Sequence, residues 1–102
     1  MNFNVKPSSQ FTADLRAIIT FISVDDASGA RSVQLELNRK ITLLRLRPLA
    51  FQLRPELGQD LRVIRVFNYL LIYRLLDDTV MLDRLVHSSQ DFETIFKNDD
   101  EK

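Results

Sequence analysis

Cysteine is absent from the 102 residues of the sequence, and the only histidine is His87. Without cysteine the chain cannot form a disulfide, bind zinc through thiolates or use a thiol as a nucleophile. The absence fits a reducing compartment, and we expect a cytoplasmic protein. A lone histidine with no thiol offers too few ligands for a transition metal, so we expect neither a metal nor another cofactor.

Glycine and long apolar runs are scarce as well. Gly29 and Gly58 are the only glycines, which excludes a glycine-rich loop that cradles phosphates. The longest uninterrupted apolar run extends from Tyr69 to Tyr73, far short of the ~20 residues of a membrane-spanning helix. The N-terminal stretch MNFNVKPSSQ has no apolar core of the kind that a signal peptide needs. We therefore expect no membrane partner.

The charges balance overall but are unevenly distributed. Residues 31–76 hold nine cations, eight of them arginine, against three acids, whereas residues 77–102 hold eight acids against three cations. One interpretation is an uneven solvated surface. The other is a basic face that meets an anionic partner, for which arginine is well suited because its guanidinium binds carboxylates or phosphates with two hydrogen bonds.

Two amphipathic helices are predicted in the first half of the chain. Ser8 is a candidate N-cap, because its hydroxyl can accept a backbone N–H of the first helical turn. Asp25 and Asp26 offer a second N-cap, and Pro48 ends the second helix. The two apolar stripes, at helical spacing, are Phe11, Leu15, Ile18, Ile19 and Ile22, then Ala30, Val33, Leu37, Ile41 and Leu44. The short link between them predicts a helical hairpin.

Three strands are predicted in the second half, after a loop over residues 45–60 that contains two prolines and a glycine. They cover Leu61–Phe67, Tyr69–Leu76 and Val80–Val86. The links are Asn68, which tolerates a left-handed conformation, and the segment 77–79. Two tight links in succession predict an antiparallel meander.

Neither helix can bury its apolar stripe alone, so we expect the hairpin to pack on one face of the sheet. Phe3–Lys6 supplies an additional strand. Ser88 or Ser89 can cap a short final helix whose apolar residues are Phe92, Ile95 and Phe96. The prediction is a single α+β domain over residues 1–102, of order βααβββ, with a mostly antiparallel sheet and a frayed tail over residues 98–102.

Two tyrosines of the second predicted strand share one face. Tyr69 and Tyr73 are four residues apart, and Arg74 points to the opposite face with Leu70 and Ile72. We expect the tyrosines, above all Tyr73, to belong to the core, with their hydroxyls at its rim.

The second half of the sequence resembles the C-terminal half of ParE-type toxins. That family has a proline-containing loop ending in glycine, an arginine-bearing strand, a turn with tyrosine, a strand ending in Tyr-Arg, an acidic turn and a strand ending in histidine. The matching residues are Arg54–Gly58, Leu61-Arg62, Asn68-Tyr69, Ile72-Tyr73-Arg74, Asp77-Asp78 and Leu85-Val86-His87. The first half matches more loosely, at Ala13-Asp14-Leu15 and at Ile18 followed by Phe21-Ile22. The chain is thus similar to toxins of the ParE/RelE superfamily, which share the βααβββ layout.

The resemblance implies one of two activities. RelE-like members cut mRNA on the ribosome, whereas ParE-like members poison DNA gyrase and catalyse no reaction. RelE-like nucleases carry an arginine directly after the turn residue, where this chain has Leu70. Without that cation, a nuclease would lose transition-state stabilisation at the scissile phosphate. The resemblance therefore favours a non-enzymatic toxin that binds DNA gyrase, reads no nucleic-acid sequence by itself and is silenced by a ParD-like antitoxin.

Two alternatives stay open. A RelE-like ribosome-dependent mRNA endonuclease would need a base, an acid and cations on the phosphate. The candidates for these roles are Glu56, Arg62, Arg65 and His87, although a lone histidine at a strand end is more often packed than catalytic. The other alternative is a non-toxic interaction module of the same fold.

Two sets of residues are candidates for partner binding. For the target these are Arg62, Arg65, Arg74 and Arg84, although Arg62 and Arg65 differ in parity and face opposite sides of a regular strand. For the antitoxin we expect apolar residues off the helix stripes, because a partner can cover them by helix docking or strand addition. They are Phe21, Leu35, Leu43 and Leu46, with Phe51 in the loop. Each alone could also be ordinary exposed apolar surface.

Overall fold

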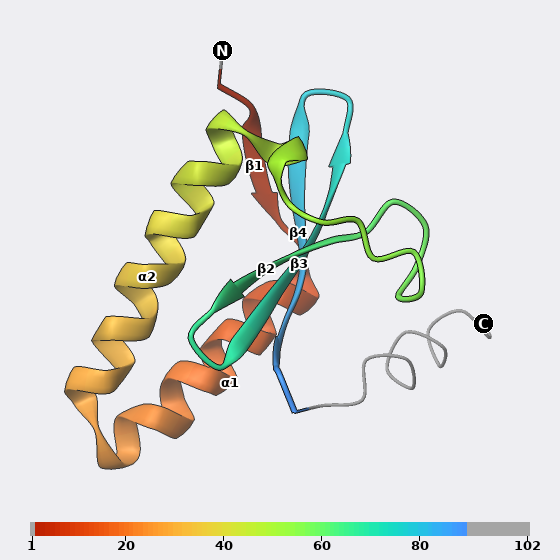
Figure 1. Ribbon diagram of the computed structural model, residues 1–102. Coiled ribbons are helices and arrows are strands. Elements are labelled where there is room, and N and C mark those ends of the chain that lie inside the picture. The colour runs from red at the N-terminus through yellow and green to blue at the C-terminus, as the bar shows by residue number, and fades with distance from the viewer. Residues whose placement is uncertain (1, 90–102) are drawn as a thin grey trace.

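The structure is a computed structural model that describes residues 2–89, and its elements follow the order β1 α1 α2 β2 β3 β4 (Figure 1). The helices are α1 (Ser9–Asp25) and α2 (Ala27–Leu46), followed by a 3-10 turn, η1 (Pro48–Ala50). The strands are β1 (Asn4–Pro7), β2 (Arg62–Val66), β3 (Tyr69–Leu76) and β4 (Thr79–His87). The predicted α+β class and βααβββ order are confirmed. The predicted C-terminal helix lies outside the described residues.

Both helices begin at side-chain caps. The Ser8 hydroxyl accepts the backbone N–H of Phe11 at 2.9 Å, and Asp26 Oδ1 accepts that of Gly29 at 2.8 Å. Asp26 also ends α1, because its own N–H donates to the carbonyl of Ile22. A single residue therefore links the two helices, which form a V-shaped hairpin (Figure 1).

The segment predicted as a loop over residues 45–60 holds more structure than the sequence indicated. Helix α2 continues to Leu46, and Pro48 begins η1. Leu53 then forms an isolated bridge with Arg62, and the backbone N–H of Arg54 donates to Leu61. Proline ends an α-helix but is well suited to the first position of a short 3-10 turn, because its φ is fixed near the helical value.

The four strands form one mixed sheet in the order β1-β4-β3-β2. Strands β2, β3 and β4 make the predicted antiparallel meander, and β1 adds to the edge of β4 in parallel, with Asn4 opposite Thr79.

Two-residue turns join β2 to β3 and β3 to β4, and the residues with positive φ in these turns are Phe67 (55°) and Asp77 (54°). The left-handed residue of the first turn is thus Phe67 and not Asn68. A positive φ at the first turn residue matches the twist of the paired strands.

Strand β4 contains a bulge at Asp83. The register pairs Tyr73 with Leu82 and Ile72 with Arg84, so Asp83 is the extra residue. Because the bulge adds one residue, Leu82 and Leu85 both contribute to the same core despite their odd spacing.

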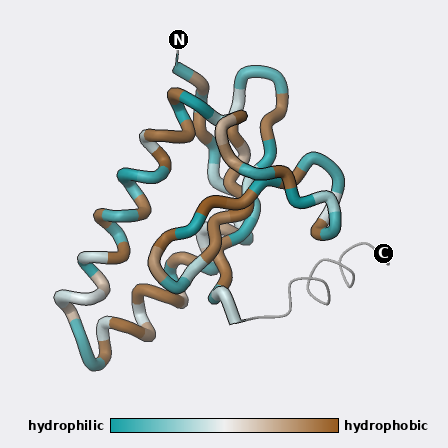
Figure 2. Tube along the Cα trace, in the orientation of Figure 1, coloured by the Kyte–Doolittle hydropathy of each residue, from teal (hydrophilic) through white to brown (hydrophobic). Residues whose placement is uncertain are grey.

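The helices cover one face of the sheet, called here the inner face, and the main core lies between them. It combines Phe11, Leu37 and Leu44 of the helices with Ile64, Val66, Leu71, Tyr73, Val80, Leu82 and Leu85 of the strands. A second, smaller cluster lies on the outer face, where Leu57 and Leu61 of the preceding loop pack on Ile72 and Val86. In Figure 2 hydrophobic and hydrophilic residues alternate along both helices, as this one-sided packing requires.

Tyr73 is a core residue, as expected. Its side chain is fully buried, and its hydroxyl donates a hydrogen bond of 2.6 Å to the carbonyl of Pro48. Burial disfavours the phenolate and raises the pKa of Tyr73 to about 12, against a smaller lowering by Arg62.

Neither helix of the described residues, 2–89, has the length and apolar character that a membrane-spanning helix needs.

Candidate functional site

A hollow of about 380 Å³ lies between α1 and the end of β4, and we call it the α1–β4 pocket. Its lining is mainly apolar on the α1 side and mixed on the sheet side. The lining residues are Asp14, Ala17, Ile18 and Phe21 of α1, Tyr69 of β3, and Arg84, Leu85, Val86 and His87 of β4. Phe21 is 79% exposed, which places this aromatic ring at the open side of the pocket.

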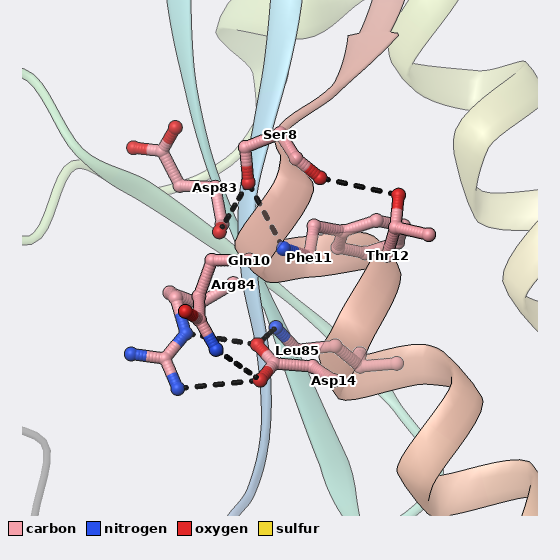
Figure 3. Close-up of polar contacts among 8 residues, drawn as sticks. All are labelled: Ser8, Gln10, Phe11, Thr12, Asp14, Asp83, Arg84 and Leu85. Carbon is pink, nitrogen blue, oxygen red and sulfur yellow. Dashed lines mark hydrogen bonds and ion pairs between the residues drawn. The ribbon is translucent and has the colours of Figure 1, made fainter.

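Asp14 joins α1 to the bulged part of β4 (Figure 3). Arg84 donates to it through Nε at 2.8 Å and through Nη2 at 3.3 Å, and the backbone N–H of Leu85 donates at 2.9 Å. Strand β1 pairs with β4 only from Thr79 to Leu82. Asp14 therefore takes over hydrogen bonding at the edge of β4 beyond the last β1 pair.

His87 packs against Tyr69 at the floor of the same pocket. The two rings meet edge to face, with centroids 5.4 Å apart and planes at 85°. Nδ1 of His87 accepts the backbone N–H of Ser89 at 3.1 Å. The Ser89 hydroxyl also lies 2.7 Å from Nδ1. His87 is thus a packed and hydrogen-bonded side chain.

The other candidates for a nuclease site are spread over both faces of the sheet. Arg62 lies opposite the buried Tyr73 and donates to the carbonyl of Phe51 at 2.6 Å. Arg65 is exposed and lies opposite Leu70, on the outer face. The two arginines therefore face opposite sides, as their parity predicts.

Glu56 is exposed in the loop before β2, where Arg54 donates a hydrogen bond to its carboxylate. That hydrogen bond is the main reason why the pKa of Glu56 lies below its usual value. A carboxylate with a lowered pKa is a weaker base and is ionised near neutral pH, so it is poorly suited to general acid–base catalysis.

Leu70 belongs to the apolar cluster of the outer face. It packs with Val63 against Leu57, Leu61, Ile72 and Val86. An arginine here would have to place its charge against this cluster or extend past it to solvent. The local packing is thus adapted to an apolar side chain at the position where the nuclease resemblance expects a cation.

The four arginines predicted to bind the target do not form one patch. Arg74 pairs with Asp83 at 2.7 Å on the outer face, and Arg84 pairs with Asp14 beside α1. Arg65 shares the outer face with Arg74, whereas Arg62 lies at η1. Arg65 and Arg74 therefore share the outer face, and Arg84, which lies opposite Ile72 in the register, reaches from that face to Asp14 at the edge of the sheet.

Four of the five residues predicted to bind an antitoxin are exposed. They are Phe21 (79%), Leu35 (60%), Leu43 (41%) and Leu46 (53%). Phe51 instead is half-buried and packs on the main core. Val24 is a further exposed apolar residue, 79% accessible, that was not among the predicted contacts. It lies three residues after Phe21 at helical spacing, and this spacing was visible in the sequence.

Solved structures resemble this one over most of the chain. The chromosomal ParDE toxin–antitoxin system from P. aeruginosa gives a TM-score of 0.71 at 16% identity, covering 83% of this chain and 95% of that chain. YafQ from E. coli strain BL21(DE3) gives 0.58 at 19% identity, with 85% and 94% covered. The toxin–antitoxin complex RelBE2 from Mycobacterium tuberculosis gives 0.54 at 24% identity, with 85% and 99% covered. At these identities the likeness establishes the fold, which is that of the ParE/RelE-type toxins.

The sequence also shows which protein family the chain belongs to. Residues 5–92 match the model of the ParE toxin of the type II toxin–antitoxin system parDE. No curated protein sequence matches the chain. Because the family model spans most of the sequence, the chain belongs to the ParE toxin family and is a type II toxin of the ParE/RelE superfamily.

Proposed function

We propose that this toxin stops bacterial growth in the cytoplasm by binding DNA gyrase, without catalysing a reaction, and that a ParD-like antitoxin neutralises it. The proposal extends the family assignment to a target, a mode of action and a partner.

The position of Leu70 is the observation that carries the non-enzymatic part of the proposal. Leu70 packs in the outer apolar cluster at the place where RelE-like nucleases hold an arginine. The remaining nuclease candidates also lack a common site: Arg62 and Arg65 face opposite sides of β2, and Glu56 is paired with Arg54 in a loop. General acid–base cleavage needs its groups within hydrogen-bond reach of one phosphate, which favours action by binding.

The antitoxin assignment rests on the exposed apolar residues of the helical hairpin. Leu35, Leu43 and Leu46 lie along the exposed side of α2, and Phe21 lies at the α1–β4 pocket. An elongated partner helix could cover such residues by the helix-in-groove mode. For the target we propose the outer face around Arg65 and Arg74, with Arg84 at the edge of that face; Arg62 faces the other side of the sheet and is not part of this surface.

The experiment that tests the target is pulse-labelling of DNA and protein synthesis just after the toxin is induced alone. We expect DNA synthesis to fall first while translation continues, and purified toxin to inhibit gyrase supercoiling. His87→Ala should leave toxicity largely intact.

Each other outcome contradicts part of the proposal. Early loss of translation, abolished by His87→Ala or Arg65→Ala, would indicate a RelE-like mRNA endonuclease. No effect on either synthesis would indicate a non-toxic interaction module. The supercoiling assay separates a direct effect on gyrase from a secondary arrest of replication.

A further inference from the structure

Among the arginines that lie on the outer face, Arg74 combines a fixed position with an exposed head group. Its Nε donates to Asp83 Oδ2 at 2.7 Å, and its side chain is 41% exposed. Arg65 is exposed but forms no ion pair within the described residues. Arg84 is held by Asp14 but is only 19% exposed. Arg74 is therefore the cation best suited to meet a partner in a defined orientation.

The bulge in β4 brings Asp83 to Arg74. Asp83 is the extra residue beside Ile72, which belongs to the outer apolar cluster, so the bulge adds a carboxylate to this face. The Ser8 hydroxyl donates to the Asp83 carbonyl, and the Ser8 backbone N–H donates to the Leu82 carbonyl, both at 2.9 Å. In Figure 3 the Asp83 carbonyl points to Ser8, whereas its carboxylate points away from α1. The start of α1 thus fixes the residue that holds Arg74.

The hydrogen bond to Asp83 occupies only part of the Arg74 guanidinium. A guanidinium donates through Nε, Nη1 and Nη2, and Asp83 takes the donor on Nε. Nη1 and Nη2 of Arg74 donate no hydrogen bond within the described residues. Together these two nitrogens can bind one carboxylate through two parallel hydrogen bonds.

The surroundings of Arg74 favour a carboxylate of a protein over the phosphates of a nucleic acid. Leu70 and Ile72 on the same face are apolar. Arg65 lies opposite Leu70, four residues along β3, so apolar side chains separate the two cations. A nucleic-acid site instead needs cations clustered along the path of the backbone. The Asp83 carboxylate beside the site would also repel a row of phosphates.

We propose that Asp83 is a positioning residue of the target surface, which holds Arg74 by Nε so that Nη1 and Nη2 bind a carboxylate of the target protein. The inference rests on the proposed function, which places the target on the outer face. A flexible side chain loses conformational freedom when it binds, and one already held in its bound orientation loses less. An ion pair with so exposed an arginine adds little to stability. Removal of Asp83 should therefore weaken target binding more than folding.

The test is a double-mutant cycle with growth arrest as the readout. The unchanged toxin, Asp83→Ala, Arg74→Ala and the double variant are induced at graded levels, and immunoblotting gives the amount of soluble toxin that halves the growth rate. Urea unfolding of the purified proteins reports their stability. Asp83→Asn is a milder second variant, because its amide oxygen can still accept from Nε. The matched control is Glu36→Ala, which removes the same charge from an ion pair with Arg39 on α2.

We expect Arg74→Ala to raise the amount of toxin needed for arrest about tenfold or more. Asp83→Ala should raise it about threefold to tenfold, Asp83→Asn by less, and Glu36→Ala should leave it unchanged. In the Arg74→Ala background, Asp83→Ala should have no further effect, because the two residues act as one unit. An equal effect in both backgrounds would give Asp83 a purely structural role and overturn the proposal, as would full toxicity of Asp83→Ala.

Arg74→Lys separates the two kinds of ligand. Lysine keeps the charge but has no planar fork for a carboxylate, so we expect toxicity close to that of Arg74→Ala. Full toxicity of Arg74→Lys would indicate a phosphate contact and overturn the proposal.

The readout also separates this inference from the proposed function. Growth arrest is measured without reference to the target, so a toxin that arrests growth but leaves gyrase supercoiling unchanged would contradict the proposed target alone. The cycle would then still decide the role of Asp83. Full toxicity of Arg74→Ala would instead contradict both the outer face as the target surface and this inference, as would the absence of arrest by the unchanged toxin.

Discussion

At the scale of single residues, Tyr73 holds η1 against the sheet. Its fully buried hydroxyl donates to the carbonyl of Pro48 at 2.6 Å. Tyr73→Phe leaves that carbonyl without its donor, and we expect a loss of about 1–2 kcal/mol in the free energy of unfolding, measured by urea denaturation. Tyr69→Phe, at a half-buried ring, is the control and should cost less than about 0.5 kcal/mol. Equal losses in the two variants would show that the Pro48 hydrogen bond contributes nothing.

The same residue makes stability depend on alkaline pH. Burial raises the pKa of Tyr73 to about 12 in the folded state, whereas a tyrosine in the unfolded chain titrates near 10. The folded state therefore binds the proton more tightly, so this contribution is complete below pH 10 and is lost as pH rises toward 12. We expect the stability of Tyr73→Phe to fall less than that of the unchanged protein over this interval. Parallel curves would contradict the assignment.

Asp14 is the residue that ties α1 to β4. It accepts hydrogen bonds from Arg84 and from the backbone of Leu85, and its side chain is only 11% exposed. Asp14→Asn removes the charge that balances Arg84, and we expect a loss of about 1–3 kcal/mol in the free energy of unfolding. The control is Arg39→Ala. Arg39 pairs with Glu36 at the surface and is 73% exposed, so its loss should cost at most about 0.5 kcal/mol.

Residue-level prediction from sequence worked where the physical cause is local. Ser8 and Asp26 cap their helices because the accepting oxygen lies three residues before the amide that it caps. The Asp14–Arg84 pair was not predicted, because its partners lie 70 residues apart and meet only once β4 is bulged. Phe67 was missed as the left-handed residue, since phenylalanine has no intrinsic preference for positive φ.

At the scale of elements, a substitution at the junction of α1 and α2 has two opposing effects on stability. A Cβ on Gly29 would lie 2.4 Å from Asp26 Oδ2, the carboxylate that caps α2. Gly29→Ala therefore gains up to about 1 kcal/mol of helix propensity but disturbs a cap worth about 1 kcal/mol. We expect Gly29→Ala to be neutral or destabilising by itself and stabilising in an Asp26→Ala background. The unchanged chain, the two single variants and the double variant form a double-mutant cycle. Their thermal unfolding measures the coupling between positions 26 and 29, and additive effects would contradict that coupling.

The helices and strands could be predicted from the sequence pattern, whereas the way they assemble could be predicted only in part. The helix stripes and the meander were predicted because apolar spacing and short links are local signals. The parallel pairing of β1 with β4 was not, since a short strand can join either edge of a sheet. The bulge at Asp83 was missed because it breaks the two-residue period on which strand assignments depend.

At the scale of the whole molecule, exposed apolar residues occur on more than one surface. Leu35 and Leu43 lie on α2, and Leu76 lies at the end of β3. We expect Leu35→Asp with Leu43→Asp to weaken binding of the cognate antitoxin about tenfold or more, because charges would then face an apolar partner. Leu76→Asp, at a residue 52% exposed, is the matched control and should bind normally. Titration calorimetry measures both, and unchanged affinity in the double variant would rule out this side of α2.

The candidate site shows why the function was harder to predict from the sequence than the fold. The arginines were visible in the sequence, but their distribution over two faces depends on the register of β2 and β3. Leu70 was informative without a structure because one apolar residue replaced an expected cation. The pocket beside α1 was invisible, since it forms where β1 stops and α1 crosses the edge of β4.

The parallel pairing of β1 with β4 has a consequence for biosynthesis. The first strand of the chain completes its hydrogen bonds only with residues 79–82. The ribosome synthesises the N-terminus first. Strand β1 of the growing chain therefore remains unpaired until nearly all of the described fold has been translated. The sheet is therefore completed only after residues 79–82 have emerged from the ribosome.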